Sequence, residues 1–107
     1  MNSKNHIGAA GELLVCAFFL EQGLEVFRNV ASSGPVDLVV WNPENNKSVC
    51  VDVKSHSTVM YRADGALSPS YCPKWVDHIA IVKFFHADKS VSLPEGFWEV
   101  LGMETAE

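Results

Sequence analysis

The stretch VCVDVKS at residues 49–55 predicts a β-strand with two different faces. Alternate residues of an extended chain point to opposite sides of a sheet, so the three valines share one face. Cys50, Asp52 and Lys54 share the other face. A carboxylate and an ammonium on one side of an apolar strand have two interpretations, a solvent-exposed edge with a weak ion pair or an active site. The surrounding sequence has to decide between them.

The whole sequence has the composition of one globular domain. It contains 107 residues, of which 48% are hydrophobic and 20% are charged, so we expect a single domain over residues 1–107. Its longest apolar run, LLVCAFFL at 13–20, is too short to span a membrane, and the N-terminal residues lack the pattern of a signal peptide. Three separate cysteines without a CxxC pair are typical of reduced thiols rather than of a zinc site. These features predict a cytoplasmic protein.

The charge balance is the feature that fits nucleic-acid binding least well. Eight lysines and arginines stand against 13 aspartates and glutamates, which gives a net charge of −5. Proteins that bind phosphate backbones usually carry a surplus of basic residues. Binding of a nucleic acid would therefore require the positive charges to gather in one place.

The first half of the chain predicts a helix followed by three strands. Residues 5–22 have a helical pattern, and Gly23 suits the left-handed position that closes a helix. Strand-forming, β-branched and aromatic residues follow in three runs, separated by loop and turn residues, at 24–30, 36–42 and 48–55.

The second half predicts a crossover and a central strand. Residues 78–85 are almost continuously apolar, as in a strand covered on both faces. The connection at 55–77 is long enough to join two parallel strands, and Pro73 is a candidate first residue of a short helix within it. Residues 96–103 fit either a last strand or a short helix. This order of elements predicts an α/β (α+β) domain with a mixed sheet flanked by helices.

Asp37 is predicted to lie close to the polar face of the third strand. If 36–42 and 48–55 pair as a hairpin about the intervening turn, residue 37 falls opposite about residue 53. Two carboxylates, those of Asp37 and Asp52, then meet at one end of the hairpin. They repel each other unless a cation or a proton lies between them. Taken alone, Asp37 is better explained as an aspartate at a turn or at the start of a strand that bonds to nearby backbone.

Glu12 is the third acidic candidate. On a helix, Glu12 and Glu21 point about 180° apart, and Val15, Cys16 and Phe19 fall on the side of Glu12. The sequence leaves open which of the two glutamates lies near the apolar seam. Small residues at 8–11, with glycine at both ends, would let a backbone or a ligand approach the helix closely, or would serve packing alone.

These acidic groups and the neighbouring lysine suit a hard cation. Mg²⁺ prefers carboxylate oxygens, often binding through one or two of them together with a phosphate. Such an ion can activate a water molecule, and a lysine beside it can stabilise the negative charge of a phosphoryl transition state. The set therefore points to phosphodiester hydrolysis with Mg²⁺, for which Mn²⁺ is expected to substitute.

The motifs resemble those of the PD-(D/E)XK nuclease superfamily, and of archaeal-type Holliday-junction resolvases within it. The likeness covers about residues 4–54 and comprises Glu12 in GAAGE, Asp37 in PVD, and Asp52 and Lys54 in DVK, in the order of the family. The third motif has aspartate where many relatives have glutamate. No glutamine follows Lys54 to form the QxxxY signature of RecB-like nucleases.

The resemblance implies a restriction-endonuclease-like αβββαβ core, Mg²⁺-dependent cleavage of branched or double-stranded DNA, a homodimer, and a role in DNA recombination or repair. It implies that Asp37, Asp52 and the Val53 carbonyl hold the metal, that Glu12 completes or tunes the site, and that Lys54 acts on the attacking water or the transition state. A loop serine of the resolvases corresponds to Ser32 or Ser33.

Several other side chains are candidates for contacts to the substrate. They are Lys4, Arg28, Arg62 and Lys74, together with His56, for which a surface histidine is the simpler interpretation. Tyr61, Tyr71 and Trp75 in the crossover would either stack on exposed bases or pack the loop onto the core. A second class of function also stays open, in which the nuclease fold has no catalytic activity and serves as a nucleic-acid or protein binding module.

Overall fold

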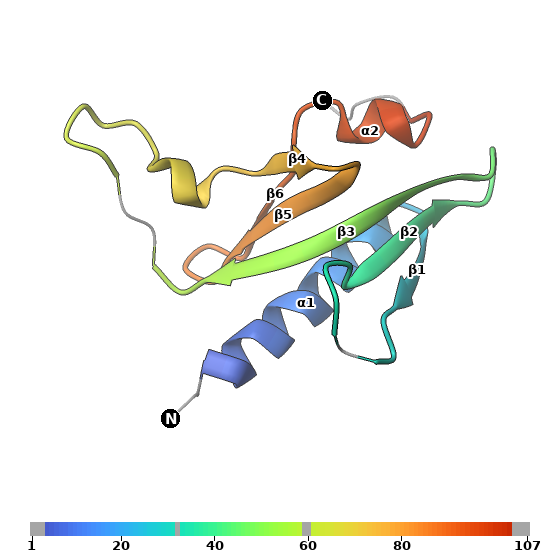
Figure 1. Ribbon diagram of the computed structural model, residues 1–107, viewed down its shortest axis with the longest axis horizontal. Coiled ribbons are helices and arrows are strands. Elements are labelled where there is room, and N and C mark those ends of the chain that lie inside the picture. Colours follow the sequence, from blue (N-terminus) through green and yellow to red (C-terminus); the bar gives the residue numbers. More distant parts are fainter. Residues whose placement is uncertain (1–3, 32, 59–60, 104–107) are drawn as a thin grey trace.

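The computed structural model describes residues 4–31, 33–58 and 61–103 (Figure 1). The elements in chain order are α1 (Lys4–Glu21), β1 (Glu25–Arg28), β2 (Leu38–Asn42), β3 (Lys47–His56), the 3-10 helix η1 (Pro69–Tyr71), β4 (Lys74–Val76), β5 (Ile79–Phe85), β6 (Ser90–Ser92) and α2 (Phe97–Val100). The predicted first helix and the next three strands are confirmed, and each of their ends lies within two residues of the predicted one. Residues 97–100 form a helix, which settles the alternative left open for 96–103.

The strands form one mixed sheet, as predicted. Their order is β1–β2–β3–β5–β4, and β6 pairs with β5 beside the end of β4. The first three strands are antiparallel neighbours, whereas β3 and β5 run parallel. The long connection between β3 and β5 is therefore a crossover, in agreement with its length.

Both helices lie on the same face of the sheet. Val15, Cys16 and Phe19 of α1 are buried on it, and the Phe19 ring stacks on Phe97 of α2 with 5.4 Å between ring centroids. The strand residues in this core alternate along each strand: Leu38, Val40, Val49, Val51, Ala80, Val82 and Phe84. The domain therefore has two layers. We call the opposite side of the sheet, which carries Asp52, Lys54 and Lys83, the outer face.

Helix α1 approaches β3 closely at Gly11. A Cβ atom added to Gly11 would overlap the Ser55 side chain, whereas one added to Gly8 would meet nothing within 4 Å. The expected close approach of a small-residue stretch is thus confirmed at Gly11, whereas Gly8 faces open space. Among the described residues, no helix has the length and apolarity needed to cross a membrane.

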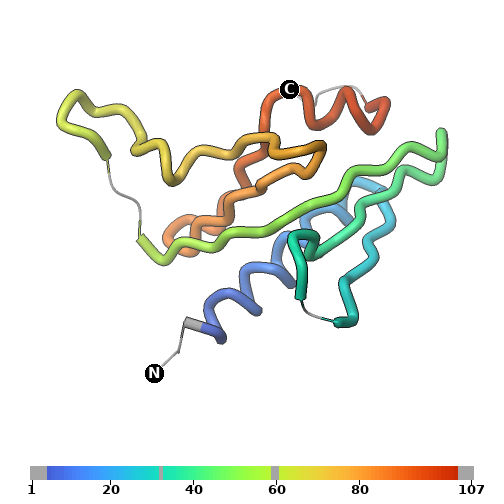
Figure 2. The backbone as a smooth tube through the Cα atoms, in the orientation of Figure 1, coloured from blue at the N-terminus to red at the C-terminus, as the bar shows by residue number. Residues whose placement is uncertain are grey.

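The crossover differs from the prediction. Its described part contains η1 and β4 but no α-helix, and Pro73 lies between these two elements instead of opening a helix. Figure 2 shows this segment extending away from the sheet before β4 returns to it. Residues Lys74–Val76 pair with β5 through a tight turn in which Asp77 and His78 have φ of 49° and 67°. Forming one isolated helical turn is unfavourable, whereas pairing with β5 bonds the backbone of this stretch to the sheet.

Candidate functional site

The hairpin of β2 and β3 brings Asp37 to the outer face beside Asp52. Leu38 pairs with Val51, which places Asp37 opposite Asp52, one residue from the predicted register. The Val53 N–H donates to Asp37 Oδ2 at 2.8 Å, and the Asp37 N–H donates to the Val51 carbonyl at 2.9 Å. Backbone and side-chain bonds together therefore fix Asp37 against β3.

Asn29 organises the loop that leads into Asp37. Its Nδ2 donates to the carbonyl oxygens of Ser33 at 2.7 Å and Val36 at 2.9 Å. The Asn29 backbone N–H donates to the Asp37 carbonyl at 2.9 Å. Sequence reasoning missed this residue, although an asparagine directly after a strand is a familiar organiser of local loops.

Asp52 is the most perturbed acid of the site. Its side chain is 13% exposed, and Lys54 Nζ lies 3.3 Å from Asp52 Oδ2. Burial raises the pKa of the Asp52 carboxyl, as does its hydrogen bond with Asp37, while the Lys54 ammonium opposes both effects. The Asp52 carboxyl therefore keeps its proton to a higher pH than an isolated aspartate does. A cation placed between the two carboxyl groups would relieve their repulsion.

Glu12 is engaged elsewhere in this structure. Arg28 donates to Glu12 Oε2 through NH2 at 2.7 Å and through Nε at 3.2 Å. Over the part of the chain that the structure describes, no three His, Cys, Asp or Glu residues are grouped closely enough to hold one metal ion. The structure thus brings together Asp37, Asp52 and Lys54 and leaves Glu12 with Arg28. A role for Glu12 at a metal stays a prediction, and it would require this ion pair to open.

The two aspartates fit the chemistry of a Mg²⁺ site. Mg²⁺ keeps several waters and is commonly held by one or two carboxylates rather than by a full protein cage. Asp37 and Asp52 supply two adjacent carboxyl groups, between which a cation would relieve the electrostatic repulsion. The Val53 carbonyl belongs to the same stretch of β3. The donor set is therefore small but appropriate.

Lys83 is a site residue that sequence reasoning missed. It lies directly opposite Lys54 on the parallel strand β5 and is only 7% exposed. Burial lowers the pKa of Lys83, and the Lys54 and Lys74 ammonium groups lower it further, while Asp52 opposes them. The signal that could have identified it is the one charged residue inside the apolar run HIAIVKFF at 78–85.

The other predicted contacts have different positions. Lys74 pairs with Ile81 on β5, two residues before Lys83, and so lies on the outer face. Arg62 is exposed and forms an ion pair with Asp64 at 3.0 Å. Ser33 is exposed. Ser32 and the side chain of Lys4 lie outside the described part of the chain.

The interpretation of His56 as a surface histidine is wrong. Its ring stacks on Phe85 with 5.6 Å between centroids and meets Tyr71 edge-on at 4.7 Å. Burial and the nearby Lys83 lower the pKa of His56, and its Nε2 is buried without a hydrogen-bond partner in the structure. His56 is therefore a half-buried side chain that lies between aromatic rings beside the lysines.

The crossover aromatics mainly pack the loop onto the domain. The Trp75 indole N–H donates to the Glu95 carbonyl at 2.7 Å, and its ring stacks near Phe97 with 6.3 Å between centroids. Tyr71 contacts His56, whereas Tyr61 is 66% exposed. The packing interpretation is thus confirmed for Trp75 and Tyr71.

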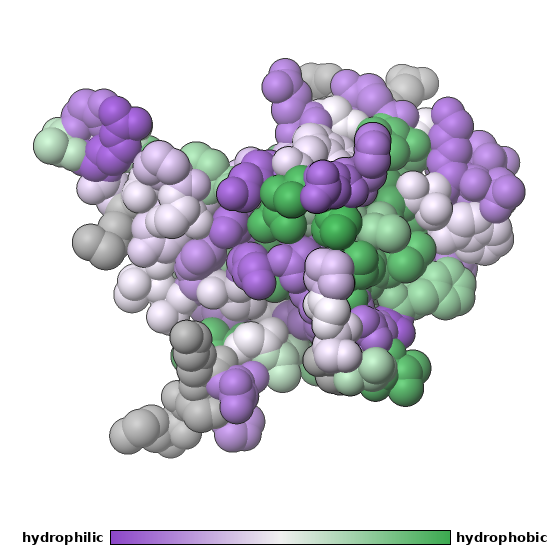
Figure 3. Space-filling model, in the orientation of Figure 1, coloured by the Kyte–Doolittle hydropathy of each residue, from purple (hydrophilic) through white to green (hydrophobic). Residues whose placement is uncertain are grey.

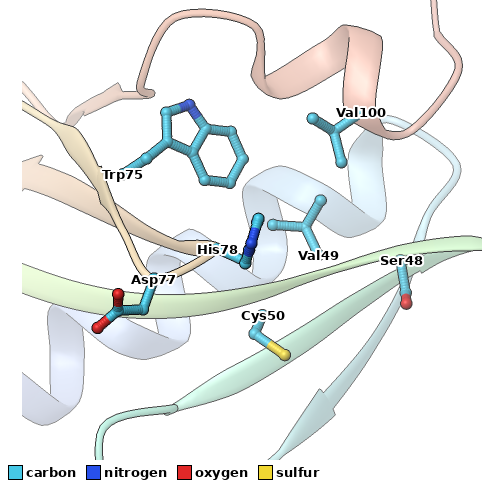
Figure 4. Close-up of a pocket in the computed structure, with 7 residues that line it drawn as sticks. All are labelled: Ser48, Val49, Cys50, Trp75, Asp77, His78 and Val100. Atoms are coloured by element: carbon cyan, nitrogen blue, oxygen red, sulfur yellow. The ribbon is translucent and has the colours of Figure 1, made fainter.

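A largely apolar groove lies near the start of β3, away from Lys54. It has a volume of about 700 Å³ and lies between β3, the β4–β5 turn and α2, as Figure 4 shows. Its lining residues are Ser48, Val49, Cys50, Trp75, Asp77, His78 and Val100. In the view of Figure 3, hydrophobic and hydrophilic side chains alternate in the middle of the molecule, and hydrophobic ones continue toward its right side.

Comparison with known proteins adds no relative to this description. No family model matches the chain, and no curated protein or solved structure matches it either. Its candidate site therefore has to be argued from its own residues.

Proposed function

We propose that this protein is a Mg²⁺-dependent endonuclease that hydrolyses DNA phosphodiester bonds, with a PD-(D/E)XK site on a restriction-endonuclease-like core. The observation that carries the proposal is the contact of Asp37, Asp52 and Lys54 at one place on the outer face. Two adjacent carboxyl groups and an ammonium 3.3 Å from one of them are the groups that this chemistry needs.

Each residue has a separate task in this proposal. Asp37 and Asp52 would hold Mg²⁺ with the Val53 carbonyl, and the ion when bound would supply an activated water and a Lewis acid. Lys54 is 58% exposed, so its ammonium can turn from Asp52 toward a phosphate oxygen. There it would orient the attacking water and stabilise the negative charge that develops on the phosphoryl group.

We further propose that the protein acts as a homodimer on branched or double-stranded DNA. One copy carries one such site, and cutting both strands of a duplex requires two. Leu13, Leu14 and Leu20 of α1 are 52%, 41% and 55% exposed, which leaves apolar surface available to a second copy. Sedimentation analysis tests this part: a mass of one chain at every concentration would contradict it.

A panel of DNA substrates tests the activity. Supercoiled, linear and four-way-junction DNA are incubated with the protein and Mg²⁺ or Mn²⁺, and Asp52→Asn protein serves as the control. We expect cleavage of at least one substrate by the wild type alone. Equal product from both proteins on every substrate would overturn the proposal.

The engagement of Glu12 by Arg28 favours a second candidate, a nuclease fold without catalysis that binds nucleic acid or protein. The acidic composition points the same way. A metal titration separates the two, because a ligand that binds only the folded state raises its stability. The catalytic candidate predicts stabilisation by Mg²⁺ or Mn²⁺ that is lost in Asp37→Asn, whereas a binding module predicts none.

A further inference from the structure

Lys83 is a buried lysine that has no polar partner. Within residues 4–31, 33–58 and 61–103 its side chain takes part in no hydrogen bond and no ion pair, although the residue is only 7% exposed. Asn42, which is buried to the same degree, donates to the Leu101 carbonyl at 2.8 Å. The Lys83 ammonium is not sealed off from solvent, so it is accessible to an anion from outside the protein.

The sheet surrounds Lys83 with further donors. Lys54 of β3 and Ser92 of β6 lie directly opposite it on its two neighbouring strands, so all three side chains point to the outer face. Lys74 of β4 lies on the same face, opposite Ile81. Three of the eight basic residues of an acidic chain therefore gather on three neighbouring strands.

The carboxylate in this surrounding is already in use. Asp52 is paired with Lys54 at 3.3 Å and bonded to Asp37; its charge acts on Lys83, but among the described residues it forms no ion pair with Lys83 or Lys74. In the proposed function it would also hold the metal. The lysines then need a negative charge from outside the protein.

We propose that Lys83, Lys54 and Lys74 form an anion site that takes phosphate groups of a nucleic-acid backbone next to the bond that is cut. This inference rests on the proposed function for its substrate, but the site itself does not depend on cleavage. Lys83 holds a phosphate oxygen from the floor of the site, Lys54 and Lys74 bind from the two sides, and the Ser92 hydroxyl donates from β6. The local concentration of positive charge offsets the acidic balance of the rest of the chain.

Phosphate titrations of the metal-free full chain test the site. The probes are inorganic phosphate and a dinucleotide with one phosphodiester, followed by NMR of labelled lysine side chains. We expect the signals of the three lysines to shift with one common Kd. Lys83→Met, which keeps the apolar stem, should weaken binding at least about tenfold because it removes a charge-assisted hydrogen bond. Lys47→Met, at the exposed start of β3, should bind as the wild type does.

Stability separates this role from a structural one. If Lys83 serves only to hold the sheet together, Lys83→Met lowers the midpoint of urea unfolding. The anion site predicts an equal or higher midpoint, since methionine keeps the buried stem and removes a partly desolvated charge that has no side-chain partner. If Lys83→Met fails to fold, Lys74→Met at the exposed end of the site decides. Phosphate affinity unchanged in Lys74→Met would then overturn the inference, and a several-fold loss would support it.

The result is distinguishable from the test of the nuclease. Cleavage of DNA by the wild type together with unaltered phosphate binding by Lys83→Met overturns the anion site and leaves the activity standing. The opposite pair of results is a wild type that binds phosphate but cleaves none of the DNA substrates, together with a Lys83→Met variant that no longer binds phosphate. It supports the anion site and overturns the activity.

Discussion

The Asp37 carboxylate accepts a hydrogen bond from the backbone N–H of Val53 at 2.8 Å. This bond joins the residue just before β2 to the stretch of β3 that carries Asp52 and Lys54. One oxygen of this carboxylate is used in the backbone hydrogen bond, and the other can contact Asp52 or a cation. Structure and proposed chemistry therefore depend on the same side chain, and substitutions can separate them.

Replacement of Asp37 separates the two roles. Asp37→Ala loses the bond to Val53 and should lower the free energy of unfolding by about 1.5 to 3 kcal/mol, the usual range for a hydrogen bond to a charged group. Asp37→Asn keeps an oxygen acceptor and should retain most of the stability while losing the response to Mg²⁺. Urea unfolding with and without Mg²⁺ measures both effects, and equal stability of Asp37→Ala and wild type would contradict the structural role.

Asp52 should make the protein less stable as the pH rises. Its pKa is raised in the folded state, so between the ordinary value and the raised value the folded chain holds a proton that the unfolded chain has lost. The free energy of unfolding therefore falls with increasing pH over that interval. Asp52→Asn cannot ionise and so lacks this pH-dependent loss of stability. In the absence of metal, it should unfold at a higher urea concentration than the wild type at neutral pH and at the same concentration in acid. A wild type more stable than Asp52→Asn at neutral pH would mean that the Lys54 pair dominates.

Two glycines of α1 provide a matched pair. Gly11→Ala should destabilise the protein by about 1 to 3 kcal/mol, because the added Cβ overlaps Ser55 and forces α1 away from β3. Gly8→Ala meets open space and should stabilise by up to about 1 kcal/mol through helix propensity. Thermal unfolding of the two variants side by side checks the prediction. If both alanines change the midpoint in the same direction, the close contact of α1 with β3 is wrong.

Asn29 should control the position of Asp37 without touching a metal. Asn29→Ala loses the bonds to Ser33 and Val36 and should cost about 1 to 2 kcal/mol together with a several-fold loss of Mn²⁺ affinity. Asn29→Asp keeps the oxygen that accepts from the Ala31 N–H but loses the donor, so it should behave like Asn29→Ala in metal binding. Calorimetric titration with Mn²⁺ provides the measurement. Wild-type affinity in both variants would show that the loop does not position Asp37.

Much of the fold could be read from local patterns, and the parts that could not depend on tertiary pairing. The alternation in VCVDVKS predicted the faces of β3 correctly, because one side of that strand packs against α1. Strand β4 was missed because its three residues are held only by pairing with β5, through a turn that lacks the usual glycine. The helix expected near Pro73 failed for the same reason.

The candidate site shows the same division. The proximity of Asp37 and Asp52 could be predicted from the sequence, since a tight hairpin fixes its own register. The position of Lys83 could not be predicted, because its place opposite Lys54 depends on which strand lies beside β3 after a long crossover. The pairing of Glu12 with Arg28 likewise depends on how α1 packs against β1, which the helical pattern alone does not determine.

The most direct test of the proposed chemistry is the rate of Mg²⁺-dependent DNA cleavage by Lys54→Met measured against the wild type. The Lys54 side chain is 58% exposed, so its loss should leave the urea midpoint nearly unchanged. We predict a rate at least about 100-fold lower than that of the wild type, because an ammonium at the reacting phosphate stabilises the transition state. A folded Lys54→Met protein that cleaves DNA at the wild-type rate would contradict the proposed site.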